Sequence, residues 1–280
     1  MFAHKMIEVI LDSDWCPEAW DKQEYFKEVA KSVLNVRRSH HFYYSTDGVY
    51  DASDLDSLHS ARLPFPATTI CVDESGGERS IIFCSKFNTA ETAAADEYQG
   101  FTPLFSYTVL SQSEKNKRPI LVPVIGTIGV QDGSMNMSAR SFSFIEEFSR
   151  SLSDHDLDDY LRGITYYGAQ VLRFLRLLHS SNIETSDVPA PSRLNKKRRS
   201  RGREPIKPYK VLKIRHSDGR LSPVNLPTDP KGSTRFHHVR GHFRTVMKGR
   251  GENKKPVDTW VVPHVRGNKN KGEVKKDYRL

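Results

Sequence analysis

Apolar and polar positions follow two different periods along the chain, and the change between them marks the expected elements. Within the first forty residues, apolar side chains recur at helical spacing after Pro17, which suits a first helical turn. The helical period returns later, as a stripe over 142–152 and as a longer helix from Leu157 to His179. The sequence therefore predicts helices on either side of a central stretch of different character.

That central stretch has the composition of strands. The expected strands are 39–44, 68–72, 80–84, 104–110 and 120–130. The second and third are joined by the glycine-containing turn 73–78, which predicts a hairpin. Pro123 interrupts the last strand, so we expect it to be bent or to lie at a sheet edge.

Beyond Pro208 the pattern indicates a small β-rich module. Its strands are expected over 209–214, 235–247 and 258–266, with a turn at Asp218-Gly219 after the first. The fold class is therefore α+β. The expected parts are a mixed α/β-sheet domain at 1–188, a basic flexible linker at 189–208 and a small antiparallel β-rich module at 209–280.

The net charge of +9 conceals a strong asymmetry. Residues 1–191 hold 17 Lys and Arg residues against 27 Asp and Glu residues, a balance of −10. Residues 192–280 hold 26 against 7, a balance of +19. An excess of this size attracts a polyanion, and like charges keep a run such as 195–203 extended.

Composition also argues against several classes of protein. Three widely spaced cysteines without a Cys-x-x-Cys pair suggest neither a zinc ribbon nor a disulfide framework, so a reducing compartment is expected. No signal peptide and no run of about 18 apolar residues is recognisable, so we expect a cytoplasmic protein with no membrane partner. No phosphate-binding loop, zinc-protease, nucleophile-elbow or dinucleotide motif occurs, and neither a cofactor nor a metal is expected.

A four-residue element is repeated in the basic third of the chain. His238-Val239-Arg240-Gly241 recurs 26 residues later as His264-Val265-Arg266-Gly267. Because side chains alternate along a strand, the two predicted strands would place one set on a common face. That set is His238, Arg240, His242, Arg244, Trp260, His264 and Arg266. If the two strands pair as an antiparallel sheet, these side chains lie on its exposed face, which carries no carboxylate, and apolar side chains lie on the other face.

Four interpretations of such a face compete. In the first, the face is merely solvated. In the second, it binds nucleic acid: arginine guanidinium groups bind phosphates through paired hydrogen bonds, and histidine and tryptophan rings stack on bases. Alternatively it is a metal-independent ribonuclease, in which His238, His242 and His264 exchange protons with a 2′-hydroxyl and an arginine stabilises the phosphate. A metal site on the same imidazoles is disfavoured, because the neighbouring arginines repel a cation.

The linker is expected to add phosphate contacts, although the same composition is typical of a merely solvated stretch. The candidate nucleic-acid-binding residues are Arg240, Arg244, Arg266, Trp260, Lys196, Lys197, Arg198, Arg199 and Arg201.

The segment Arg235 to Arg244, together with Trp260, 263–268 and Lys276-Asp277-Tyr278, resembles a C-terminal element of proteins from phages and other bacterial mobile elements, whose function is not known. Leu63-Pro64-Phe65-Pro66 resembles another piece of those proteins. The resemblance implies a phage or mobile-element origin. It implies no activity and no catalytic residue.

Together these features predict a nucleic-acid-binding protein, with RNA favoured over DNA and a binding role favoured over an enzymatic one. One alternative is an RNA-cleaving toxin or host-takeover nuclease that uses the same histidines. A second is an interaction module that binds and inhibits a host protein.

Overall fold

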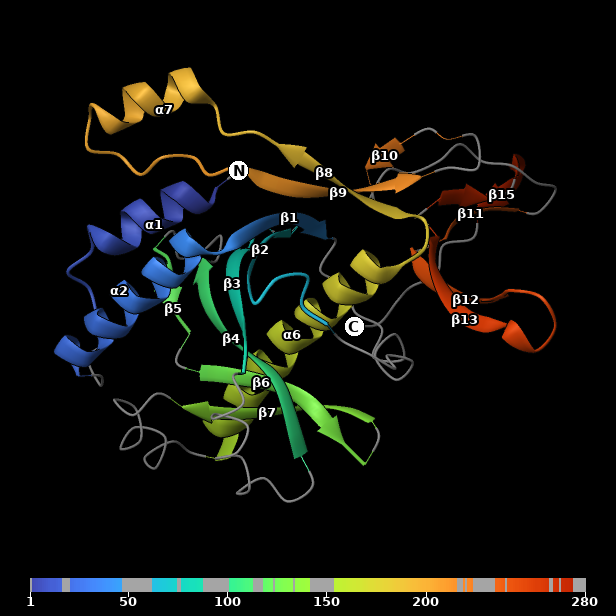
Figure 1. The fold of residues 1–280 in the computed structure, drawn as a ribbon, viewed down its shortest axis with the longest axis horizontal. Helices are drawn as coiled ribbons and strands as arrows, with labels where there is room; N and C mark the ends of the chain where they lie inside the picture. The colour runs from blue at the N-terminus through green and yellow to red at the C-terminus, as the bar shows by residue number, and fades with distance from the viewer. Residues whose placement is uncertain are drawn as a thin grey trace. The chain divides into compact units, whose positions relative to one another are not determined.

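The structure is a computed structural model that describes residues 2–16, 21–46, 62–74, 77–87, 101–112, 118–122, 124–132, 134–141, 154–215, 219, 221–223, 235–239, 241–261, 264–266 and 268–273. The fold is α+β with a β-rich C-terminal module, as the sequence predicts (Figure 1). The chain forms two compact units. Unit 1 comprises Met1–Leu175 and Asp187–Val211, and unit 2 comprises Arg176–Ser186 and Leu212–Leu280.

Unit 1 contains helices α1 (Ala3–Leu11), α2 (Lys22–Arg38) and α7 (Ser192–Arg199), and most of α6 (Asp154–His179). Its strands are β1 (His40–Thr46), β2 (Ala67–Glu74), β3 (Arg79–Lys86), β4 (Phe101–Gln112), β5 (Ile120–Leu121), β6 (Val124–Gln131) and β7 (Ser134–Ser141). Strands β8 (Ile183–Val188) and β9 (Tyr209–Arg215) pass from one unit into the other.

The sheet of unit 1 is mixed, with the strand order β9-β1-β2-β3-β4-β6-β7 and β5 beside β4. Strand β1 is parallel to both of its neighbours, and the other pairs are antiparallel. The predicted hairpin is confirmed as β2–β3, in which Ile70 pairs with Ile82. The predicted strand 120–130 is described as two strands, β5 and β6, and β6 lies between β4 and β7 rather than at a sheet edge, while Pro123 lies outside the described residues.

Helices cover both faces of this sheet (Figure 1). Helices α1 and α2 pack with one face around a core that includes Ile7, Val33, Cys71 and Leu110. On the other face, the Phe174 ring of α6 lies 5.2 Å from that of Phe42 and 6.1 Å from that of Tyr44, centroid to centroid. Burial from two sides explains why the middle of β2 is an uninterrupted buried run rather than an alternating one.

Local signals set where the helices begin. The Asp21 side chain accepts a hydrogen bond from the Glu24 N–H at 2.8 Å, so α2 begins at Lys22. Pro17 and the stripe 142–152 lie outside the described residues. The long helix predicted to begin at Leu157 is confirmed as α6, which starts at Asp154.

Unit 2 is built from short strands. They are β10 (Leu221–Pro223), β11 (Arg235–Val239), β12 (His242–Lys248), β13 (Lys255–Val261), β14 (His264–Arg266) and β15 (Asn268–Glu273), with a 3₁₀ turn η3 (Gly251–Asn253). Strand β10 pairs antiparallel with β9, β12 pairs antiparallel with β13, and β11 lies between β14 and β15.

The division of the chain differs from the predicted one in two places. Residues 189–208 are not an extended linker, because they belong to unit 1 and contain α7. Strand β9 does not begin a separate module, since its first residues pair with β1, where Val211 stands opposite Tyr43. The second segment of unit 2 therefore starts within β9, at Leu212.

Two glycines of α6 provide a matched test of helix–sheet packing. A Cβ at Gly168 would lie 2.8 Å from the Tyr107 hydroxyl oxygen and 2.2 Å from Met137 Sδ, whereas a Cβ at Gly163 would meet nothing within 4 Å. We expect Gly168→Ala to lower the free energy of unfolding by about 1–3 kcal/mol through overpacking. Gly163→Ala should raise it by up to about 1 kcal/mol through helix propensity. Urea denaturation measures both, and equal effects would contradict this packing.

Candidate nucleic-acid interface

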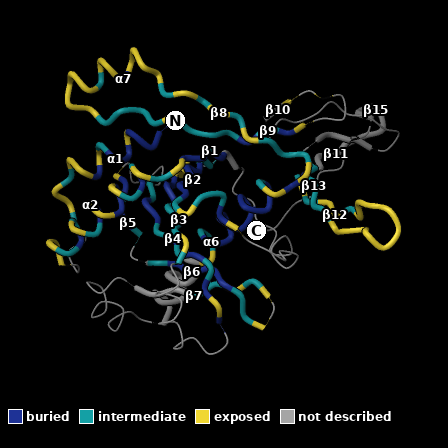
Figure 2. The backbone as a smooth tube through the Cα atoms, viewed as in Figure 1, coloured by how far each residue is buried: buried dark blue, intermediate teal, exposed yellow. Residues whose placement is uncertain are grey.

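Helix α7 and the turn after it carry a dense set of exposed cations. They are Arg193, Lys196, Lys197, Arg199, Arg201 and Arg203. None of the six has a carboxylate partner among the residues that the structure describes. Figure 2 shows this segment as almost continuously exposed. We call residues 192–203 the basic segment.

Two side chains of α7 face inward and hold the basic segment in place. Asn195 is buried, its Nδ2 donates to the Ile206 carbonyl at 2.7 Å, and its Oδ1 accepts from the Ile206 N–H at 2.8 Å. Arg198 donates from Nε to the Glu204 carbonyl at 2.7 Å and from Nη2 to Glu8 Oε1 at 2.6 Å. The chain after the helix is thereby folded back along it.

Carboxylates of unit 1 complete this attachment. Glu8 also accepts the Glu204 N–H at 2.8 Å, and the Glu204 carboxylate takes both Nε and Nη2 of Arg37, at 3.0 and 2.5 Å. We call Glu8, Arg37, Arg198 and Glu204 the Glu8–Glu204 network. Charge-assisted and bidentate bonds of this kind are the strong class of protein hydrogen bonds.

Arg198 therefore differs from the other predicted contact residues of the linker. Its side chain is 12% exposed and is engaged by Glu8 and by a carbonyl, so it is a structural residue. Lys196, Lys197, Arg199 and Arg201 are exposed, as a phosphate contact requires.

Two buried histidines lie close to the network. His4 of α1 and His41 of β1 are 7% and 4% exposed. His41 Nε2 lies 2.7 Å from the Val36 carbonyl oxygen, so Nε2 carries the proton. Burial lowers the pKa of both rings, assisted by the charge of Arg198 at His4 and of Lys207 at His41.

In unit 2, the hairpin β12–β13 has one packed face. Phe243 stands opposite Trp260, with ring centroids 4.8 Å apart. Arg176 lies over the Phe243 ring at 4.1 Å, and its Nε is 2.9 Å from Asp258 Oδ2. The Trp260 backbone is bound by both amide atoms of Asn182. This face and the turn of α6 into β8 thus form the core of the hairpin.

The placement of Trp260 on the histidine and arginine face is wrong. The register puts the indole on the Phe243 face, and the side chain is only 2% exposed. A buried indole offers no surface on which a base could stack.

The opposite face of the hairpin and its turn are basic and exposed. Its exposed basic residues are His242, Arg244, Lys248 and Lys255 on the strands and Arg250 and Lys254 in the turn, and the same face also carries the half-buried pair Val246 and Val257. Figure 2 shows the connection between β12 and β13 as exposed throughout. The Lys248 Nζ donates to Ser181 Oγ at 3.0 Å, while Arg244 has no carboxylate partner among the described residues. The sequence pattern selected Arg244 and His242 as candidate residues. It did not select Lys248, Lys254 and Lys255, which lie at or between the ends of β12 and β13.

The predicted single sheet is not formed. The strand expected over 235–247 is divided into β11 and β12, which pair with different partners. Gly241, the last residue of the first copy of the repeat, lies between β11 and β12, and a glycine adds no side chain to hold a strand together. The two copies of the repeat instead pair with each other, His238 opposite Val265 and Val239 opposite His264.

The three candidate catalytic histidines are consequently spread over three strands. In the pairing of β11 with β14, His238 and His264 stand at register positions that belong to opposite faces of the sheet. His242 belongs to β12, in another sheet. Arg240 lies outside the described residues, and Arg266 is described only as a position on β14 opposite His237. Within the described part of the chain, no group of three His, Cys, Asp or Glu side chains is arranged to hold a metal ion.

Comparisons with protein-family models, with curated proteins and with solved structures find no match to this chain. Among the described helices, none is both long and apolar enough to cross a membrane. The function must therefore be argued from the geometry of the chain itself.

Removal of Arg198 tests the structural role of the Glu8–Glu204 network. Arg198→Met should lower the free energy of unfolding by about 1.5–3 kcal/mol, because it leaves Glu8 without its charged partner. Arg193→Met, an equal change at an exposed position of the same helix, should alter it by less than about 0.5 kcal/mol. Urea denaturation measures both variants. Equal stability of the two would show that Arg198 does not hold the segment.

Acidification should destabilise the fold through His4 and His41. Their pKa values in the folded state lie below the ordinary 6.5, so the unfolded chain binds protons first as the pH falls. The free energy of unfolding should therefore decrease below about pH 6.5, by at most about 1.4 kcal/mol per pH unit for each histidine. In a His4→Gln/His41→Gln variant this decrease should be shallower. Urea titrations at several pH values measure the slopes, and identical slopes would refute the assignment.

Proposed function

We propose that this protein binds nucleic acid by contacting its phosphates, with the basic segment as the principal contact. The observation that carries the proposal is the contrast within α7. The two inward side chains, Asn195 and Arg198, are satisfied by bonds to unit 1, while the six outward cations of the segment have no carboxylate partner among the described residues.

An attached basic helix is well suited to a polyanion. Arginine forks match phosphate oxygens in two parallel bonds, and lysines add a less directional attraction. Because α7 is already folded and fixed, little backbone ordering opposes binding. Displacement of counterions from the nucleic acid then supplies much of the affinity.

The exposed face of the β12–β13 hairpin supports the same function in unit 2. A two-stranded ribbon is narrow enough to enter the major groove of B-form DNA, and its cations can contact phosphates on the way. Trp260 is buried, so its indole is not placed to stack on bases, and phosphate contact is the mode we propose. The preference for RNA remains a prediction.

The setting that we propose is the cytoplasm of a bacterial host, with the phage or mobile-element origin that the C-terminal resemblance implies. None of Cys16, Cys71 and Cys84 forms a disulfide in the structure. Burial raises the pKa of Cys71 to about 12, which keeps this thiol protonated and unreactive. Free, inert thiols are compatible with a reducing compartment.

Salt-dependent titrations test the proposal. Fluorescently labelled single-stranded RNA, single-stranded DNA and duplex DNA are titrated by anisotropy at several KCl concentrations. We expect log Kd to rise linearly with log salt, with a slope of about 0.7–0.9 per phosphate contacted. The variant Lys196→Gln/Lys197→Gln/Arg199→Gln should make this slope shallower by about 2–3.

The matched control removes three cations from α2, as Lys22→Gln/Lys27→Gln/Lys31→Gln, and should leave the slope unchanged. A separate Arg244→Gln/Lys254→Gln/Lys255→Gln variant measures the contribution of the hairpin. Absence of binding to all three nucleic acids at low salt would refute the proposal. An equal loss in the α2 control would refute the role of the basic segment.

A further inference from the structure

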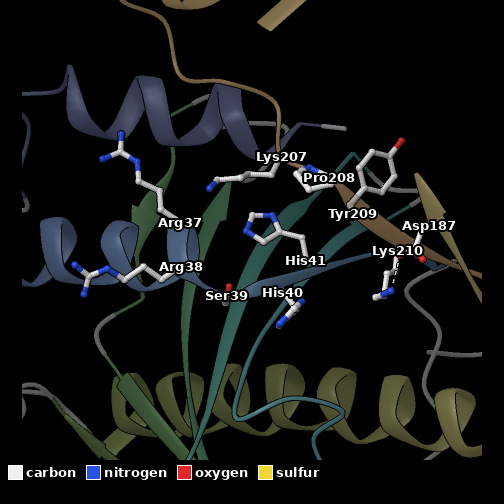
Figure 3. A pocket seen from close by; sticks show the side chains of 10 residues that line it. All are labelled: Arg37, Arg38, Ser39, His40, His41, Asp187, Lys207, Pro208, Tyr209 and Lys210. Carbon is white, nitrogen blue, oxygen red and sulfur yellow. Dashed lines mark hydrogen bonds and ion pairs between the residues drawn. The ribbon is translucent and has the colours of Figure 1, made fainter. Parts of the chain in front are cut away.

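Unit 1 contains a cavity of about 310 Å³ that the proposed nucleic-acid contact does not use. It is lined by Arg37, Arg38, Ser39, His40, His41, Asp187, Lys207, Pro208, Tyr209 and Lys210. Figure 3 shows that these side chains come from the end of α2, the start of β1, the start of β9 and the last residues of β8. Its volume is at the lower end of the range of small-molecule sites, about 300–1,000 Å³.

The charges around this cavity do not cancel. Arg37 is bound bidentately by Glu204, and the Lys210 Nζ lies 2.5 Å from Asp187 Oδ1. Arg38 and Lys207 then remain, and no carboxylate pairs with either among the described residues. Two cations around one cavity repel each other, and a dianionic ligand would convert this repulsion into attraction.

A buried histidine ring, that of His41, also borders the cavity. The Nε2–H of His41 is used by the Val36 carbonyl, and Nδ1 is buried without a hydrogen-bond partner. Burial lowers the pKa of this ring, so at neutral pH Nδ1 is an unprotonated acceptor. The ring is therefore neutral and adds no charge to the lining of the cavity.

Flat rings lie on the walls of the cavity. The His40 ring is stacked on Phe65 at 3.8 Å, and the Tyr209 ring lies 5.9 Å from that of Tyr43, centroid to centroid. Both contacts limit the movement of the lining rings. They give the site apolar surfaces beside its cations, as in sites for aromatic or sugar-bearing ligands.

We propose that this cavity binds a phosphate monoester of about the size of a mononucleotide, with Arg38 and Lys207 on the phosphate. This site is independent of the phosphate contacts proposed for the basic segment. The same chemistry is presented by a free mononucleotide and by the 5′-phosphorylated end of a strand.

Calorimetric titration of the full chain with adenosine monophosphate and with adenosine tests the proposal. The monophosphate should bind and adenosine should not, because the phosphate supplies the interaction with Arg38 and Lys207. Lys207→Gln and Arg38→Gln should each weaken binding of the monophosphate by about 10- to 100-fold, the loss of one charged hydrogen bond. Lys27→Gln, an exposed lysine of α2 remote from the lining, should leave it unchanged.

Competition by oligonucleotides distinguishes the two sources of the phosphate. Displacement of the monophosphate by a 5′-phosphorylated oligonucleotide, and not by its 5′-hydroxyl form, would identify a strand end as a ligand. Failure of both to compete would identify a free mononucleotide. The proposal is overturned if no monophosphate binds at about 10 mM, or if Lys207→Gln and Lys27→Gln bind it equally. Neither result would affect the salt dependence expected for the basic segment.

Discussion

The attachment of Arg198 to Glu8 is the interaction on which both proposed binding sites of unit 1 depend. An isolated helix of eight residues is too short to be stable in water, and α7 also carries a run of like charges. Glu8 offsets both costs, because one carboxylate oxygen accepts from the Arg198 guanidinium and from the Glu204 backbone N–H. Glu204 is thereby placed against Arg37, and the chain continues from there to Lys207. The exposed cations of the basic segment and the cationic lining of the cavity therefore rest on one small set of bonds.

Much of the fold could be predicted because its signals are local. The β2–β3 hairpin is encoded by two β-branched runs and a glycine turn, and α6 by a helical stripe long enough to exclude a strand. The fold class follows from their order along the chain. The course of residues 189–208 was predicted wrongly because its determinants are distant. Arg198 and its partner Glu8 are 190 positions apart, and charge density alone indicates an extended chain.

The candidate site shows a similar division. Lys196, Lys197, Arg199 and Arg201 are exposed, and their identity alone was enough to select them. The common face of the histidines was predicted wrongly, because side-chain parity holds only within one uninterrupted strand. Strand β11 ends at Val239, so the alternation of faces does not continue from β11 into β12. In the next hairpin, the pairing of Phe243 with Trp260 places Trp260 on the face opposite to that of His242. The two copies of the repeat pair with each other as β11 and β14. We therefore attribute the repeat to strand pairing.

The distribution of carboxylates distinguishes the proposed binding surface on α7 from the solvated surface of α2. On α2, the exposed Lys27 and Lys31 each pair with a glutamate three residues earlier, at 3.2 and 3.3 Å. Such pairs balance charge locally and leave little attraction for a polyanion. On α7, the carboxylate contact that the structure describes is made to the inward Arg198, and the outward cations keep their charge uncompensated. A helix that needed only solubility would not require this segregation, since mixed signs serve that purpose at less electrostatic cost. The arrangement is instead the one expected when the neutralising charges are supplied by a ligand.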